Sequence, residues 1–305
     1  MRNWLTAVAL VAMMSAGAQA QQVAGLGDVS ATIDADDFSA LRVRGGALLR
    51  YETPFHYIGL AAQTTQYTES GWRAEAPGVF LLWRSQKPAT LEGIAAEAGV
   101  VRVTGRMRVI GDATWSLRPL AQTGIELIAA GDLVGTRRAL ENAIAYRFTA
   151  ASIEQGIGKR FTVIGLAGMQ HFTDGNDRVH LRGRLIYVVA PEQGLSVQLQ
   201  WRQYESNQLD VGEAYFNPER YRQWHGGLSI RRRSAGWMLY ASAAAGREQI
   251  DGGTERTIWL ADLRMERAIG RAHLALHAGY NRSAGFGTAE DYWDRSLGVT
   301  IIVPF

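Results

Sequence analysis

The clearest pattern along the chain is an alternation of apolar and polar residues with a period of two. One stretch illustrates it: apolar Leu195, Val197, Leu199 and Trp201 alternate with polar Ser196, Gln198, Gln200 and Arg202. Residues 41–51, 106–118 and 271–281 follow the same rule. Strict alternation over such lengths predicts β-strands with one apolar and one polar face. Each run is about the ~10 residues that a tilted membrane strand needs.

The alternating runs and the turn signals between them predict sixteen strands in one domain. We expect them near residues 28–35, 40–51, 56–68, 72–85, 91–104, 106–119, 123–133, 142–156, 160–173, 178–190, 194–206, 221–233, 235–249, 255–268, 271–282 and 291–305. An even number puts both ends of the chain on one side. The connections on that side are short, and the longer ones (135–141, 174–177, 207–220, 251–254 and 283–290) lie on the other. This is the pattern of outer-membrane barrels, with short periplasmic turns and longer outer loops.

A membrane sheet must close, because hydrocarbon offers no partner for a bare backbone N–H or C=O group. The predicted fold class is therefore all-β: a transmembrane, antiparallel, up-and-down β-barrel of about sixteen strands. The alternative is a soluble periplasmic β-sandwich or barrel, whose strands also alternate. Sheets this large usually split into two packed layers, which favours the membrane barrel.

The tryptophans offer a second indication of a lipid-facing wall. In the predicted topology they fall toward the two ends of the strands: Trp72, Trp201, Trp224, Trp259 and Trp293 at the outer end, and Trp83, Trp115 and Trp237 at the inner end. Aromatic belts at both interfaces are typical of membrane barrels. Tryptophans scattered through a soluble core are the alternative.

The first twenty residues predict a secretory signal peptide. Arg2 gives the positive n-region, residues 4–14 the apolar h-region, and Ala18-Gln19-Ala20 the cleavage site. We therefore expect a mature domain from residue 21 to residue 305, located in the outer membrane of a Gram-negative bacterium. The chain has no cysteine, which excludes disulfides and thiolate metal sites. Its net charge is only +3 and its arginines are spread along strands, so we expect no nucleic-acid partner.

The polar face predicts the chemistry of the barrel interior. Its candidate lumen-lining residues, for binding or selectivity, are Arg42, Arg44, Arg106, Arg108, His180, Arg182, Arg184, Arg202, Tyr204, Arg231, Asp262, Arg264 and Glu266. A sixteen-stranded barrel is wide enough for an aqueous channel, and arginine-rich walls favour anions. The alternative is that these charges only solvate the interior and pair with acids such as Asp112, Asp262 and Glu266. The tyrosines Tyr57, Tyr204, Tyr221 and Tyr240 suit either stacking on sugar faces or plain packing.

No pattern in the chain indicates an enzyme. There is no GxSxG elbow and no HExxH sequence. His273 and His277 share one strand face, but that spacing separates them by ~13 Å, too far for one metal ion. We expect no catalytic residues, no metal and no cofactor.

One stretch carries a resemblance to a known family. Tyr215-Phe216-Asn217-Pro218-Glu219-Arg220-Tyr221 lies in the longest loop and runs into the strand that ends Ile230-Arg231-Arg232-Arg233; Trp237-Met238-Leu239-Tyr240 and Ala245-Gly246-Arg247-Glu248 follow. This region resembles the C-terminal barrel of bacterial exopolysaccharide exporters, of the type of the cellulose synthase operon outer-membrane subunit, with the poly-N-acetylglucosamine porin as a relative. The resemblance covers about the last hundred residues well and the earlier strands in outline.

The resemblance implies a sixteen-stranded barrel that passes a growing polysaccharide out of the cell and has no catalytic residues. Tyr215, Phe216, Pro218 and Tyr221 then belong to a gating loop. Such exporters usually carry a tetratricopeptide-repeat region before the barrel, whereas here only residues 21–27 precede the first predicted strand. A separate periplasmic repeat scaffold is therefore a possible partner, beside outer-membrane lipid, the polysaccharide and the barrel assembly machinery.

The last strand predicts how the barrel closes. Leu297, Val299, Ile301, Val303 and Phe305 alternate with small or polar residues. We expect this strand to pair with the first one, and Ile301, Val303 and Phe305 to form the assembly signal found in the outer-membrane proteins that it resembles. The functional hypothesis is a passive channel that exports an exopolysaccharide of the kind found in biofilms. A general or anion-preferring porin and a plugged structural or receptor barrel remain alternatives.

Overall fold

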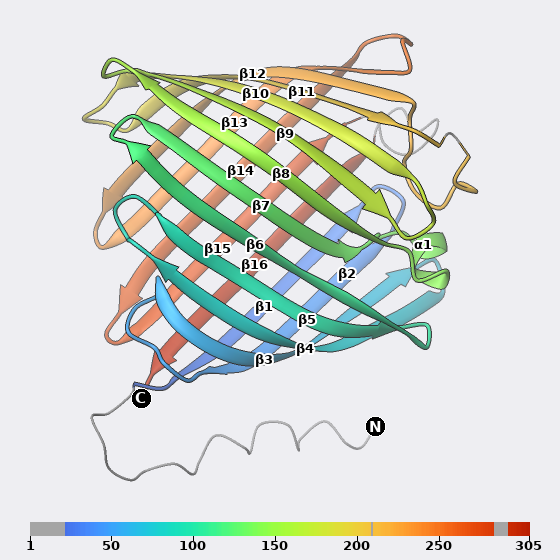
Figure 1. Cartoon of the computed structure of the whole chain (residues 1–305), viewed down its shortest axis with the longest axis horizontal. Helices are drawn as coiled ribbons and strands as arrows, with labels where there is room; N and C mark the ends of the chain where they lie inside the picture. The colour runs from blue at the N-terminus through green and yellow to red at the C-terminus, as the bar shows by residue number, and fades with distance from the viewer. Residues whose placement is uncertain (1–21, 209, 284–291) are drawn as a thin grey trace.

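The computed structural model describes residues 22–208, 210–283 and 292–305 and contains a closed barrel of sixteen antiparallel strands (Figure 1). The strands are β1 Ala24–Asp34, β2 Ser39–Leu48, β3 His56–Glu69, β4 Trp72–Gln86, β5 Gly93–Val103, β6 Arg106–Leu120, β7 Thr123–Leu133, β8 Ala145–Ile157, β9 Phe161–Phe172, β10 Asp177–Ala190, β11 Leu195–Ser206, β12 Arg220–Ser234, β13 Trp237–Ile250, β14 Arg256–Ile269, β15 Ala272–Arg282 and β16 Trp293–Pro304. A short helix, α1 Arg137–Glu141, lies between β7 and β8. The predicted fold class is confirmed.

Each strand pairs with its neighbours in sequence, and β1 pairs with β16 to close the sheet. Tight hairpins connect several of the pairs. Ser70–Gly71 and Thr104–Gly105 both have two consecutive residues with positive φ, the conformation of the two-residue turn that matches the twist of a hairpin. Glycine occupies the second position because it adopts positive φ without steric cost.

The outer wall of the barrel is apolar. Alternate strand residues such as Leu60, Val79, Val109, Leu228 and Leu297 are more than half exposed, while their neighbours point inward. Trp83, Trp115, Trp201, Trp224 and Trp259 are also exposed on this wall. Trp72 differs from the prediction, because it packs against the interior cluster of apolar side chains. An apolar outer wall around a closed sheet is what a hydrocarbon environment requires.

The two ends of the barrel are unequal. The longest fully described connection, 134–144, lies at one end, which we call the long-loop end, together with residues 207–208 and 210–219 between β11 and β12; α1 lies there (Figure 1). The opposite, short-turn end carries connections such as 121–122 and 235–236. In the described ranges, no helix has the length and apolar character that crossing a membrane would require. The predicted signal peptide lies outside the described residues.

The inner face is divided into a packed part and a hollow part. Across β1–β7, inward side chains form a buried apolar cluster that includes Leu48, Phe80, Val101, Val103 and Leu140 of α1. The inner faces of β10–β16 carry mainly polar side chains and, with residues of β7–β9, surround a cavity. The interior is therefore packed mainly on the first side, where a smaller cavity of about 160 Å³ remains, and more hollow on the other.

Candidate functional site: a basic cavity and its closure

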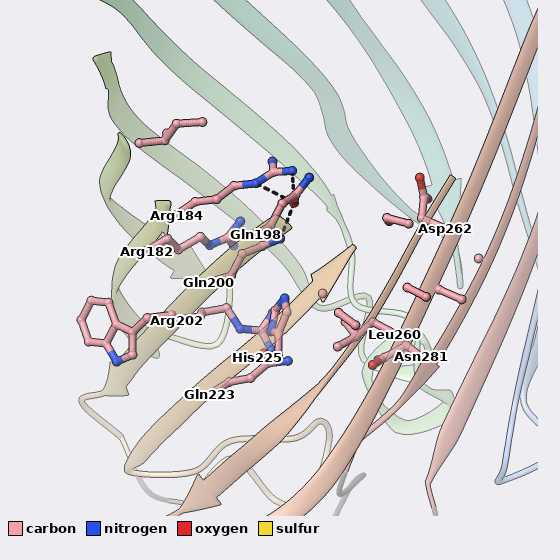
Figure 2. A pocket seen from close by; sticks show the side chains of 18 of the residues that line it. Arg182, Arg184, Gln198, Gln200, Arg202, Gln223, His225, Leu260, Asp262 and Asn281 are labelled. Carbon is pink, nitrogen blue, oxygen red and sulfur yellow. Dashed lines mark hydrogen bonds between the residues drawn. The ribbon is translucent and has the colours of Figure 1, made fainter. Parts of the chain in front are cut away.

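The largest cavity in the described part of the chain has a volume of about 630 Å³ and lies inside the barrel. Figure 2 shows two facing walls: β10–β12 on one side and β14–β15 on the other. The first wall carries Arg182, Arg184, Gln198, Gln200, Arg202, Gln223 and His225, and the second carries Leu260, Asp262 and Asn281. Both sets stand at alternate strand positions, which is why a period of two in sequence places them on one face.

The first wall concentrates positive charge. Arg182 of β10 is directly opposite Arg202 of β11 in the antiparallel ladder, and Arg184 is the next inward residue on β10. The positive charges of Arg182 and Arg202 act unfavourably on one another. Arg184 donates hydrogen bonds to Oε1 of Gln198 (Figure 2). Nε2 of Gln198 in turn donates to the hydroxyl of Ser229. We call Arg182, Arg184 and Arg202 the arginine triad.

The triad lacks acidic partners. Within the described residues, no carboxylate oxygen lies within 4.0 Å of any of its three guanidinium groups. Asp262, an acid on the facing wall, is already engaged: Arg264 donates to its Oδ1 at 3.0 Å, and Nε2 of His277 lies 3.1 Å from its Oδ2. The positive charge of the triad is thus available to something other than the barrel's own carboxylates.

Three buried side-chain nitrogens beside the triad have no hydrogen-bond partner. They are Nε of Arg202, Nδ1 of His225 and Nδ1 of His180, and they lie on the adjacent strands β10, β11 and β12. They are the complete set of such buried side-chain atoms among the described residues. A buried polar atom without a partner costs free energy, so their gathering at one place marks it as a site.

Other predicted arginines of the inner face are fully paired. Arg44 makes a two-pronged contact with Glu97, at 2.7 and 2.9 Å, and also donates to Gln63 and lies over the ring of Phe80. Arg42 reaches Asp132 at 3.3 Å. Both contacts join strands that are not neighbours in the sheet, so they cross the interior. Arg42 and Arg44 therefore agree with the alternative that inward charges pair with acids of the barrel.

The remaining predicted residues lie nearer the ends. Arg106 and Arg108 donate to the backbone carbonyls of Asn142 and Ala143, and so hold the segment after α1. At the short-turn end Arg231 is exposed, and Glu266 lies 4.0 Å from His273. None of these four lines the main cavity.

Residues 210–219, part of the predicted gating loop, pack at the long-loop end. The rings of Tyr215 and Phe172 stack at 4.6 Å between centroids, and Tyr204 stacks on Tyr221 at 4.9 Å. Phe216 contacts Tyr221 edge-on, and Pro218 is buried. We call Phe172, Tyr204, Tyr215 and Tyr221 the aromatic cluster. All four residues are buried. Tyr204 and Tyr221 therefore pack against other protein side chains, as the second of the two alternatives for the tyrosines expects.

Arg178 stands at the centre of this closure, a residue that the sequence did not indicate. Its guanidinium lies 4.8–5.4 Å from the ring centroids of Phe172, Tyr204 and Tyr215. It donates to Ser206 and Asn217 and to the backbone carbonyl of Phe216. Burial raises the pKa of the Tyr215 hydroxyl, which therefore stays protonated and donates to Asp174. The loop is thus held by polar contacts within an aromatic cluster.

The same loop reaches across the barrel mouth to α1. Arg138 and Glu213 form an exposed ion pair at 2.8 Å, and the hydroxyl of Thr136 donates to the carbonyl of Ala214. Thr136 also caps the helix by accepting from the N–H of Ala139. Ala139 and Ala214 are buried in one cluster. The two longest described connections therefore meet over the interior.

A second cavity, of about 450 Å³, lies beneath this cover and is bordered by Asp34, Glu69, Arg137 and Phe216. Arg202 borders both this cavity and the main one. It therefore borders both the arginine-rich interior and the space beside Ala214 and Phe216 at the long-loop end.

At the short-turn end, the last residues close the sheet. The N–H of Phe305 donates to the carbonyl of Val23, and its ring lies against Gly25, where a Cβ atom would stand 3.4 Å from the ring. Phe305 is 65% exposed, and Ile301 is exposed on the outer wall. The pairing of the last strand with the first is confirmed, whereas a role as assembly signal stays a prediction.

No protein-family model and no curated protein matches this chain. Solved structures do match it. A structure described as a bacterial polysaccharide outer membrane secretin is similar over 94% of this chain and 100% of its own, with 12% identity and a TM-score of 0.65. The outer membrane protein OprD from Pseudomonas aeruginosa matches over 93% of this chain and 94% of its own, with 10% identity and a TM-score of 0.45.

The closed sheet, the apolar outer wall and the polar interior define an outer-membrane β-barrel. The polysaccharide secretin shares this fold. At 12% identity the similarity concerns the fold alone, and what passes through the barrel has to be argued from its own residues.

Proposed function

We propose that the protein is an outer-membrane conduit for the export of an exopolysaccharide, closed at its long-loop end by residues 207–219 and α1. The observation that carries this proposal is the pairing of a wide polar cavity with a non-covalent cover over one mouth. A polar interior replaces water around a hydroxylated polymer, and a cover held by hydrogen bonds can open and re-form. The secretin of similar fold, described as a polysaccharide protein, supports the choice of cargo.

Conductance in planar bilayers tests the gate. We expect the wild-type barrel to stay mostly closed, and a variant in which residues 208–218 are replaced by a short Gly-Ser linker to conduct steadily. A wild-type barrel that is open throughout would instead favour the general porin. If neither form conducts, the interior is plugged and the protein is a structural or receptor barrel.

An anion-preferring porin is the second candidate, and the arginine triad favours it. In the open loop variant, Arg182→Glu combined with Arg184→Glu should move the reversal potential toward cation preference. The matched control is Arg118→Gln, which removes an inward arginine that pairs with Glu154 near the short-turn end. An unchanged reversal potential in the double variant would remove the triad from the permeation path. If small anions pass freely and oligosaccharides do not, the result favours the porin.

A further inference from the structure

The arginine triad has the properties of a ligand site within the proposed conduit. We propose that Arg182, Arg184 and Arg202, with His225 beside them, bind the carboxylate-bearing sugar units of an acidic polysaccharide. This inference rests on the proposed export function and names its class of cargo.

The arrangement is unfavourable for the barrel by itself. Like charges directly opposite one another on neighbouring strands destabilise a sheet, and Arg182 and Arg202 are such a pair. The barrel offers a ready remedy elsewhere, since Glu97 and Asp132 neutralise Arg44 and Arg42 on the packed side. Acids such as Glu126 and Asp262 line the same cavity, but no ion pair joins an acid to the triad among the salt bridges of the described residues, and a bound anion would explain this arrangement.

The amide side chains next to the triad indicate what else the ligand carries. Gln200 and Gln223 line the same wall with amide groups that both donate and accept. Inorganic phosphate offers its oxygens and at most two hydroxyl groups at one point, whereas an acidic sugar supplies carboxylate oxygens for the guanidinium groups and several hydroxyl groups for the amides of Gln200 and Gln223.

Carboxylate also suits the geometry of arginine. The planar guanidinium binds a carboxylate through two parallel N–H donors, and such charge-assisted hydrogen bonds are about twice as strong as neutral ones. Arg202 lines both cavities, so a polymer that extends from one to the other can contact this residue. Three cationic residues on adjacent strands would let successive acidic units exchange along the wall.

Calorimetric titration of the purified barrel in detergent micelles tests the proposal. The probes are tetragalacturonic acid, its neutral galactose counterpart, and inorganic phosphate. We expect the acidic oligosaccharide to bind and to be displaced by salt, because salt screens charge pairs. Arg182→Gln and Arg202→Gln should each weaken its binding by roughly tenfold or more, the loss expected for a charge-assisted hydrogen bond. Arg118→Gln should leave it unchanged.

The outcomes separate this inference from the export function. Equal binding of the acidic and neutral oligosaccharides would overturn the acidic cargo while leaving a polysaccharide conduit in place. Phosphate binding as tightly as tetragalacturonic acid would reduce the triad to a small-anion site. No binding of any probe by the wild type would overturn the site outright. The wild-type comparison alone decides these points, so the test survives a variant that fails to assemble.

Discussion

Arginines in equivalent inward positions have two different roles in this barrel. Arg44 on the packed side is neutralised by Glu97 and contacts Gln63 and Phe80, so its charge is consumed by the structure. Arg182 on the hollow side faces another arginine and no acid within the described residues. Both residues are arginines that face inward from a strand. Their surroundings differ, and for that reason Arg44 stabilises the fold whereas Arg182 is available to a ligand.

Substitution of Arg44 should therefore destabilise the barrel. In Arg44→Gln, Glu97 would keep its place across the interior without its cation, which costs roughly 3 kcal/mol when a largely buried pair is broken. The side chain of Arg44 is only 11% exposed, so the pair is largely shielded from water. Urea unfolding in detergent micelles measures the effect. An unchanged midpoint would mean that the pair contributes nothing to the fold.

Arg182→Gln should behave in the opposite way. Removing one of two facing like charges relieves repulsion, so we expect stability within about 0.5 kcal/mol of the wild type or above it. The same unfolding measurement checks it. A loss as large as that of Arg44→Gln would show that Arg182 is structural, and would count against a binding role.

At the scale of elements, the cover depends on contacts between segments that are far apart in sequence. Arg178→Leu keeps an apolar side chain among the aromatic rings but removes the donors to Ser206, Asn217 and the carbonyl of Phe216. We expect the segment 207–219 to release, seen as a higher open probability in bilayers and faster proteolysis in that segment. If Arg178→Leu stays closed and resistant, ring packing alone holds the cover.

The chain's lack of cysteine allows a sharper test of the cover. Thr136→Cys with Ala214→Cys places two thiols where the hydroxyl of Thr136 now contacts the backbone of Ala214. Oxidation should lock the barrel shut, and reduction should restore opening, with the disulfide verified by a gel shift. Each single variant is the matched control. Opening that proceeds equally under oxidising conditions would mean that the mouth opens without separating α1 from 207–219.

The sequence predicted the strands well and the cover only in part. The alternation placed fifteen strand starts within about three residues, because burial of one face imposes the period. It extended the eighth strand to residue 142 and missed α1, since Arg137–Glu141 is too short to show a helical period. The first strand begins at Ala24, whereas the prediction began it at residue 28. The prediction began too late because Gly25 and Gly27 have no apolar side chain to mark the alternation. The ring of Phe305 lies against Gly25, a contact that sequence spacing cannot reveal.

At the scale of the whole molecule, a period of two decides which residues point inward but not how the interior is filled. The pairs of Arg42 with Asp132 and of Arg44 with Glu97 cross between distant strands. They become neighbours only when the sheet closes. The split into a packed half and a hollow half, and with it the isolation of the arginine triad, is therefore a property of the closed barrel that no single strand contains.

The last residue, Phe305, lies where β1 and β16 close the barrel. Phe305 contributes one backbone hydrogen bond to Val23 and a ring that is 65% exposed, so its deletion should cost only about 1 kcal/mol of barrel stability. We nevertheless propose that deletion of Phe305 strongly reduces the heat-modifiable barrel recovered from outer membranes, because the exposed ring is a recognition element for assembly. Refolding of the same variant into detergent micelles should succeed. Normal recovery from membranes would refute the recognition role, whereas failure in both settings would mean that Phe305 acts through the β1–β16 closure itself.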